Sequence, residues 1–395
     1  MGIERLPKPI KNAVTQIGFV KKMRARKGLR KLVFDFKLPE SKVQLVEKDP
    51  GQMQTVLAGH IEQWKDKAAE IGNTIDAIFV RRPDLTANGA EQLRQDMLFC
   101  YFAYGFTPHE YLCYGLDRKK PDERRTFVSD RESIWYAYRM NDFYAKGVFM
   151  DKMKTYFRFQ PYFKREAVCV CGESDEREFQ RFVSKHPVFV KKDVFESCGR
   201  GIELIDLTDR ALGTDSFFRS LMNGGKYILE ERVEQSNVMA ALNRSSVNTV
   251  RCLTVNTRHG ILTPWCFLKV GREGSFVDNG GAGGILVGID VESGKLATAG
   301  IDELALRYEA HPDTGIEFVG YQLPDWEDML SMCREMAAME PKNKWIGWDL
   351  AHTDRGWVVI EGNAMSEVIG PQATGQRGIR QELDRCMSDM DLVAL

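Results

Sequence analysis

The fold is decided by the stretch Trp348-Asp349-Leu350-Ala351-His352-Thr353-Asp354-Arg355-Gly356-Trp357-Val358-Val359-Ile360-Glu361-Gly362-Asn363. Apolar and aromatic runs flank Asp354-Arg355-Gly356, a pattern typical of two strands joined by a three-residue hairpin loop with a left-handed glycine. This loop predicts that Thr353 faces Trp357. Counting back four residues on each strand then places Asp349 opposite Glu361.

Three polar side chains of this predicted hairpin indicate a metal site. Directly opposed residues have Cβ atoms about 4.5–5.5 Å apart, and two like charges there destabilise a sheet. Asn363 lies two residues after Glu361, so both point to one face. A hard divalent cation would remove the repulsion and use the oxygens of Asp349, Glu361 and Asn363, and magnesium fits because it prefers one or two protein carboxylates plus substrate phosphates. The alternative is a polar strand end with solvated acids, and a one-residue slip in the loop would break the facing arrangement.

A second signal is a short strand that ends in lysines, Val188–Val190 followed by Lys191 and Lys192. It leads to Gly199 and Gly201, which let the backbone approach a phosphate and direct N–H groups at it. Lys191 would then reach a phosphate oxygen. The spacing is neither a Walker A motif nor a dinucleotide fingerprint, so a plain turn with surface lysines is the alternative.

Charged residues on two other predicted strands need partners. Tyr227–Leu229 is followed directly by Glu230 and Glu231. The backbone there could bind an adenine edge, and Glu231 could bind the purine or ribose side. The alternative is an acidic pair at the surface. Arg251 lies among the β-branched and apolar residues of Thr249–Val255 and is costly to bury unpaired. It therefore needs an anion, either an internal carboxylate or a bound phosphate.

Composition limits the classes of protein. The 395 residues exceed the ~250–300 at which a single core stops growing, so two or three lobes are expected. The net charge of −1 argues against a general nucleic-acid binder, and no apolar run reaches the ~20 residues that span a bilayer. Met1–Lys22 lacks a signal-peptide hydrophobic region and the nine cysteines show no disulfide spacing, so a cytoplasmic protein is expected. The basic segment Lys21–Lys31 could touch an anionic membrane or a polyanion; a solvated helix face is the alternative.

The order of predicted elements indicates an α+β protein, with residues 1–150 mainly helical. Strands are predicted over Val188–Val190, Tyr227–Leu229, Thr249–Val255, Ile261–Val270 and Trp357–Ile360, and a helix over Trp326–Met339. Residues 257–260 are typical of a hairpin turn. The segment Phe276–Ile285 holds four glycines in five residues, which makes it a candidate closing element over a ligand.

Taken in order, these segments resemble the ATP-grasp superfamily, and more specifically the sugar-transfer-associated ATP-grasp family, related to glutamate-ligase-like proteins. The resemblance covers about Asp151 to Arg380. Its markers are Asp151-Lys152, Phe189-Val190-Lys191 with the loop to Gly201, Asn248-Thr249-Val250-Arg251, Asp278-Asn279-Gly280-Gly281-Ala282-Gly283-Gly284, His311-Pro312-Asp313-Thr314-Gly315, Gly347-Trp348-Asp349 and Glu361-Gly362-Asn363.

The resemblance implies an ATP-grasp fold that clamps ATP and Mg²⁺ between two α+β subdomains. Residues 151–235 would form the small subdomain and residues 236–395 the large one with the metal site, after a helical region, 1–150, with a substrate or partner role. The phosphates would be faced by Lys152 and Lys191, together with Gly199 and Gly201. Glu230 and Glu231 would flank the hinge beside adenine, and Arg251 would meet the triphosphate or an acyl-phosphate. Magnesium would be held by Asp349, Glu361 and Asn363. Lys154 and Lys192 are the rivals of Lys152 and Lys191.

The resemblance also implies an activity. It is an ADP-forming ligase that activates a small-molecule carboxylate as an acyl-phosphate and joins it to an amine, in glycan or secondary-metabolite biosynthesis. His311 could position or deprotonate the amine, with a structural role as the alternative. The alternatives for the whole chain are a kinase that phosphorylates a sugar or alcohol hydroxyl and a nucleotide-binding scaffold without catalysis. Nothing in the sequence indicates the substrates or the oligomeric state.

Overall fold

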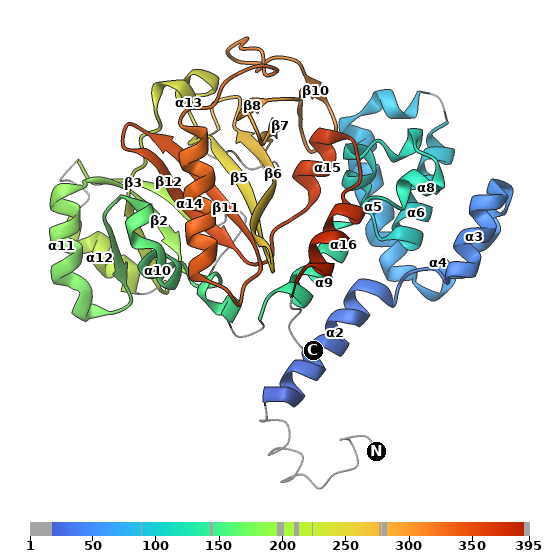
Figure 1. Cartoon of the computed structure of the whole chain (residues 1–395), viewed down its shortest axis with the longest axis horizontal. Coiled ribbons are helices and arrows are strands. Elements are labelled where there is room, and N and C mark those ends of the chain that lie inside the picture. The colour runs from blue at the N-terminus through green and yellow to red at the C-terminus, as the bar shows by residue number, and fades with distance from the viewer. Residues whose placement is uncertain are drawn as a thin grey trace, which may run out of the picture. The chain divides into compact units, whose positions relative to one another are not determined.

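A computed structural model of the chain describes residues 18–87, 89–142, 145–195, 201–208, 213–222, 224–275, 278 and 283–390. These residues form helices and antiparallel sheets (Figure 1), which confirms the predicted α+β class. They belong to two compact units: unit 1 comprises Met1–Phe143 with Glu367–Leu395, and unit 2 comprises Tyr144–Ser366. The predicted division instead ends the helical region at residue 150 and assigns residues 236–395 to one large subdomain.

Unit 1 is helical, and its described residues from Gly18 on confirm the mainly helical N-terminal region that the sequence predicts. Its α-helices are α2 (Gly18–Phe34), α3 (Glu40–Lys48), α4 (Met53–Gln63), α5 (Lys65–Arg81), α6 (Ala90–Tyr104), α7 (Pro108–Cys113), α8 (Pro121–Arg124), α9 (Asp130–Met140), α15 (Ile369–Gly375) and α16 (Arg380–Ser388). The buried Gln372 side chain of α15 bonds both the N–H and the carbonyl of Val128, which fastens the last helices to this unit. In the part of the chain that the structure describes, no helix combines the length and apolar character needed to cross a bilayer.

The smaller sheet of unit 2 carries the predicted lysine strand. Its antiparallel order is β1-β4-β2-β3, built from β1 (Ala167–Val170), β2 (Val188–Asp193), β3 (Ile202–Asp206) and β4 (Tyr227–Glu231). Helices α11 (Glu176–Lys185) and α12 (Thr214–Met222) cover one face, where Phe179, Phe218 and Leu229 share a core. Because side chains alternate along a strand, Ile228 and Glu230 point to the other face, and Ile228 joins the core of the larger sheet.

The larger sheet carries the acidic hairpin. Its order is β10-β9-β7-β6-β5-β11-β12, with β8 on β7. The strands are β5 (Thr249–Thr257), β6 (Gly260–Val270), β7 (Ile285–Asp290), β8 (Lys295–Leu296), β9 (Gly300–Ile301), β10 (Arg307–Tyr308), β11 (Trp345–Thr353) and β12 (Gly356–Asn363). Helix α14 (Trp326–Met339), seen across this sheet in Figure 1, packs Met329, Cys333 and Met336 into its core. The other helices are α10 (Lys152–Phe163), whose aromatic residues enter the same core, and α13 (Asn237–Leu242).

The hairpin β11–β12 confirms one predicted pairing and corrects another. Asp349 faces Glu361, as predicted, but Thr353 pairs with Gly356 rather than with Trp357. The loop is therefore one residue shorter than expected. A register shift beside Asp349, where β12 has the extra residue Ile360, restores the predicted facing pair; a β-bulge of this kind places two residues opposite one.

Candidate functional site

Asp349 lies at the centre of a buried ion cluster on the larger sheet. Arg251, directly opposite on β5, donates from Nη2 to Oδ2 at 2.9 Å and from Nε to Oδ1, and Lys269 Nζ of β6 donates to Oδ2 at 3.0 Å. Despite the burial of this carboxyl, Arg251 and Lys269 hold the pKa of Asp349 well below its usual range. The anion that Arg251 needs is thus an internal carboxylate.

Lys269 is a site residue that sequence reasoning missed. Its ammonium is buried, which disfavours the charged form, but Asp278 and Asp349 raise its pKa. Asp278 is itself held by the backbone N–H of Thr249 at 3.0 Å and by the Thr249 hydroxyl. The available signal was a lysine at the end of an apolar strand, which requires an anion for the same reason that Arg251 does.

Glu361 and Asn363 lie side by side at the end of β12. Asn363 Nδ2 donates to Glu361 Oε1 at 3.0 Å, so the two side chains share one face, and both are half-buried. With Asp349 opposite, the group offers carboxylate and amide oxygens, the donor type that Mg²⁺ prefers. Among the residues described, no cluster of three or more His, Cys, Asp or Glu side chains could hold a metal; this group has two carboxylates and an amide. Its donor chemistry fits Mg²⁺ through Glu361 and Asn363, whereas Asp349 is already bonded to two cations.

Lys152 is favoured over its rival Lys154 by position. Lys152 opens α10 and its Nζ donates to the carbonyl of Asp193 at the end of β2, at 2.8 Å. Burial lowers the pKa of Lys152, and the negative charge of Glu361 counters that effect. The ammonium of Lys152 therefore interacts electrostatically with the acidic end of β12. The side chain of Lys154 is 67% exposed and faces Asp151 at 3.6 Å.

Lys191 and Lys192 point to opposite faces of the small sheet. Lys191 pairs with Glu203 at 2.8 Å and lies over the ring of Tyr227 at 5.1 Å. Lys192 is buried and reaches Glu230 at 3.0 Å, on the face turned towards the core of the larger sheet. This placement favours Lys192 as the phosphate-facing lysine.

The predicted glycine loop is only partly visible. Gly199 lies outside the residues that the structure describes, whereas Gly201 forms the exposed turn that precedes β3. Gly201 has φ +68°, a left-handed conformation that favours glycine.

The carboxylates of Glu230 and Glu231 have different partners. Glu230 is fully buried and accepts hydrogen bonds from Arg165 and Lys192; although burial opposes ionisation, these two cations lower its pKa to about 2. Glu231 is half-buried; it accepts a hydrogen bond from the backbone N–H of Glu166 at 3.0 Å and pairs with Arg355 at 3.1 Å. Arg165 is a second buried cation that the sequence interpretation missed.

His311 is fully buried and bonded through both ring nitrogens to the backbone. Nε2 lies 2.8 Å from the carbonyl of Gly271, and the backbone N–H of Asp313 donates to Nδ1 at 3.3 Å. A neutral ring that donates from Nε2 satisfies both contacts. This arrangement favours the structural role that was the alternative to amine positioning.

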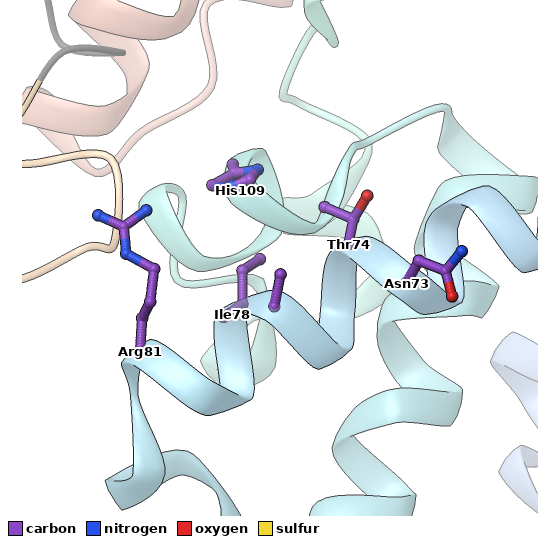
Figure 2. A pocket seen from close by; sticks show the side chains of 6 residues that line it. Asn73, Thr74, Ile78, Arg81 and His109 are labelled. Atoms are coloured by element: carbon purple, nitrogen blue, oxygen red, sulfur yellow. The ribbon is translucent and has the colours of Figure 1, made fainter.

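Unit 1 contains a separate hollow of about 290 Å³. Figure 2 shows its lining side chains, which come from α5 and α7. They are Asn73, Thr74, Ala77, Ile78, Arg81 and His109. All predicted site residues, by contrast, belong to unit 2.

An acidic hairpin on one antiparallel sheet and a lysine strand on a second sheet place the protein in the ATP-grasp class. Residues 132–387 match the family described as sugar-transfer-associated ATP-grasp. The match covers more than half of the chain, and the chain therefore belongs to that family.

Solved structures of ATP-grasp ligases resemble the chain at low identity. The ligase PsnB complexed with a precursor variant, Mg and ADP has 12% identity and a TM-score of 0.39, covering 63% of this chain and 62% of that one. PurK, an N5-carboxyaminoimidazole ribonucleotide synthetase in an ADP complex, has 10% identity and a TM-score of 0.38, covering 62% and 53%. The VanG D-Ala:D-Ser ligase from Enterococcus faecalis has 12% identity and a TM-score of 0.41, covering 63% of each chain. The chain thus spans less than two thirds of the length of each of these three. A search of curated proteins gave no match.

Proposed function

We propose that this protein is an ATP- and Mg²⁺-dependent ligase that activates a carboxylate and joins it to an amine, in glycan or secondary-metabolite biosynthesis. Membership of the family supports this, as do the names of the similar structures, which are ligases complexed with ADP or Mg. The observation that carries the proposal is the acidic end of the β11–β12 hairpin, where Asp349 faces Glu361 and Glu361 acts on the pKa of Lys152.

In the proposed reaction the substrate carboxylate attacks the γ-phosphate of ATP, which gives an acyl-phosphate and ADP. The amine then attacks the acyl carbon, phosphate leaves and an amide forms. Lys152 and Lys192 would bind phosphate oxygens and orient the chain for in-line transfer. Arg251 and Lys269 hold the Asp349 carboxylate in a fixed position, so this part of the site is organised in advance.

Glu361 and Asn363 would hold the magnesium ion, with Asp349 as the third candidate. Bound magnesium would neutralise the negative charge of the phosphates, including the charge that develops on the leaving oxygen. The lysines need not then carry the whole charge of the triphosphate.

One experiment tests the proposal and separates its rivals. The protein would be incubated with ATP, Mg²⁺ and a pool of amino acids and sugar acids, and mass spectrometry would follow ADP, phosphate and condensed or phosphorylated products together. A ligase gives an amide and releases phosphate in step with it. A stable phosphorylated product without an amine would indicate a kinase instead, and ATP binding without any turnover would indicate a scaffold.

We also propose that helix α2 gives unit 1 a partner role at an anionic membrane surface. Residues 21–31 hold seven lysines and arginines and no acid. Arg26, Lys27, Arg30 and Lys31 are exposed, and Leu32, which follows them, is 55% exposed. A basic segment with interleaved apolar side chains suits anionic lipid headgroups. A cytoplasmic location, where most thiols stay reduced, is part of the same proposal, since Cys100, Cys252, Cys266, Cys333 and Cys386 are buried thiols outside any disulfide.

A further inference from the structure

Arg165 is a buried arginine whose N–H groups donate both to a carboxylate and to backbone carbonyls. It follows α10 and precedes β1, and its side chain is only 2% exposed. Nε and Nη2 donate to one oxygen of Glu230, at 2.8 and 2.5 Å. Nη1 donates to the carbonyls of Val359, at 2.5 Å, and Phe163, at 3.3 Å. A planar guanidinium with fixed donor directions suits such a junction better than an ammonium would.

These contacts join the two sheets of unit 2. Glu230 belongs to β4 of the small sheet, and Val359 belongs to β12 of the large sheet. Val359 directly precedes Ile360, the extra residue in the register of β12, and Glu361 follows. Arg165 therefore links the strand of the candidate metal carboxylate to the carboxylate that holds Lys192.

The three side chains in direct contact carry two positive charges and one negative charge. Glu230 supplies one negative charge and contacts two cations, Arg165 and Lys192. All three side chains are at most 10% exposed, where an excess positive charge is costly without an anion. A bound phosphate would supply that anion, since Lys192 lies on the face turned to the larger sheet.

We propose that Arg165 is a positioning residue for the triphosphate: it takes up the charge of Glu230, so that Lys192 keeps a positive charge free for a phosphate oxygen. This inference rests on the proposed function. Without Arg165, Glu230 pairs with Lys192 alone, the two charges cancel, and Lys192 turns away from the ligand. Arg165 thus acts through Lys192 and does not touch the nucleotide.

The test compares the affinities of full-length variants for ATP with Mg²⁺ and for adenosine, measured by competition against a fluorescent ATP analogue. Arg165→Met should weaken ATP binding about tenfold or more, because one partner of a buried charge cluster is lost. Adenosine lacks phosphates, so its affinity should change less than about twofold. An equal loss for both ligands would indicate a merely structural role and would overturn the inference.

Arg158→Met is the matched control. Arg158 lies on α10, the helix that ends just before Arg165. It pairs with Glu340 at 2.7 Å and donates to the carbonyl of Met339 at 2.5 Å. Its pattern of partners resembles that of Arg165, but its ion pair is on the surface. Its substitution should leave ATP affinity unchanged; a loss equal to that of Arg165→Met would count against a specific role for Arg165.

A double variant separates charge from packing. Arg165→Met with Glu230→Gln removes the carboxylate that competes for Lys192, so ATP affinity should recover to within about threefold of wild type. A double variant that binds ATP no better than Arg165→Met would overturn the proposal. Should Arg165→Met not fold, Arg165→Lys keeps the charge beside Glu230 but loses the fixed donor directions, so ATP affinity should fall less than about tenfold; a larger loss there would also overturn it. Wild-type protein that does not bind ATP would refute the proposed function, whereas equal ATP binding by wild type and Arg165→Met would refute only the role of Arg165.

Discussion

Asp349 and Glu361 lie directly opposite each other on β11 and β12, but they have different surroundings. Both oxygens of Asp349 are bonded to buried cations, Arg251 and Lys269. Glu361 is half-buried beside Asn363. One carboxylate of the pair is therefore neutralised and fixed, the other accessible, and we expect substitution of the first to affect folding and of the second to affect turnover.

Glu361→Gln should abolish ATP turnover and leave the fold intact. The substitution keeps the shape of the side chain and a half-exposed position, so the melting temperature should move by less than about 2 °C. Turnover is measured as ADP release with ATP and Mg²⁺. Full activity in this variant would remove Glu361 from the metal site.

Asp349→Asn should destabilise the protein by about 3–5 kcal/mol, since two buried cations lose their carboxylate. The free energy of unfolding is obtained from urea titration. Asp354→Asn in the exposed hairpin turn is the control and should change it by less than about 0.5 kcal/mol. Equal stability of the two variants would show that the ion cluster contributes little.

Lys192→Ala should weaken ATP binding about tenfold or more, because a charge-assisted contact to phosphate is lost. Lys191→Ala should keep the affinity within about twofold, since Lys191 points to Glu203 and Tyr227 on the other face of β2. Dissociation constants from titration calorimetry decide between them. The reverse order would return the phosphate role to Lys191.

The free energy of unfolding should fall in acid as Glu230 becomes protonated. Its folded pKa is about 2 and an unfolded glutamate has a pKa of about 4.3. A lowered carboxyl pKa contributes stability above the unfolded pKa and loses it as the pH falls through the folded one, here on the order of 3 kcal/mol between about pH 4.3 and 2. Unfolding free energies of wild type and Glu230→Gln, compared from pH 7 to 2.5, should converge towards the acid end. Parallel curves would contradict this assignment.

Protein with an intact α2 should sediment with phosphatidylcholine vesicles only when they contain phosphatidylserine, and added salt should release it. Exchanging Lys27, Arg30 and Lys31 for glutamate should weaken binding about hundredfold or more, at about 1 kcal/mol per basic residue. The matched control exchanges three exposed lysines elsewhere in unit 1, which are Lys48, Lys65 and Lys120. Tighter binding to duplex DNA than to these vesicles would refute the membrane proposal.

The regular elements were predictable because their signals are local. Helix Trp326–Met339 has the predicted bounds, since its apolar residues recur at helical spacing. The predicted strand residues all lie within β2, β4, β5, β6 and β12, as their β-branched and aromatic composition indicates. The hairpin turn at residues 257–260 joins β5 to β6 as expected.

The site was less predictable because it depends on long-range order. Lys269 reaches Asp349 only because β5 lies between β6 and β11, and no local pattern gives that order. The choice between Lys191 and Lys192 depends on which face α11 and α12 cover. One residue along a strand reverses the direction of a side chain, so a local interpretation leaves both lysines open.

The extra residue in β12 has a consequence for comparing this chain with its relatives. Counting positions from the tip of the hairpin pairs Asp349 with Ile360, a residue of the wrong chemistry, because the turn has two residues and Ile360 lies outside the regular ladder. Sequence alignments of the family should therefore be anchored at Gly347-Trp348-Asp349 and at Glu361-Gly362-Asn363, with a one-residue gap allowed between them and the tip. The length of the turn can then vary among homologues through evolution while the two acids stay opposite, provided that a change in the turn is matched by a bulge beside the acids.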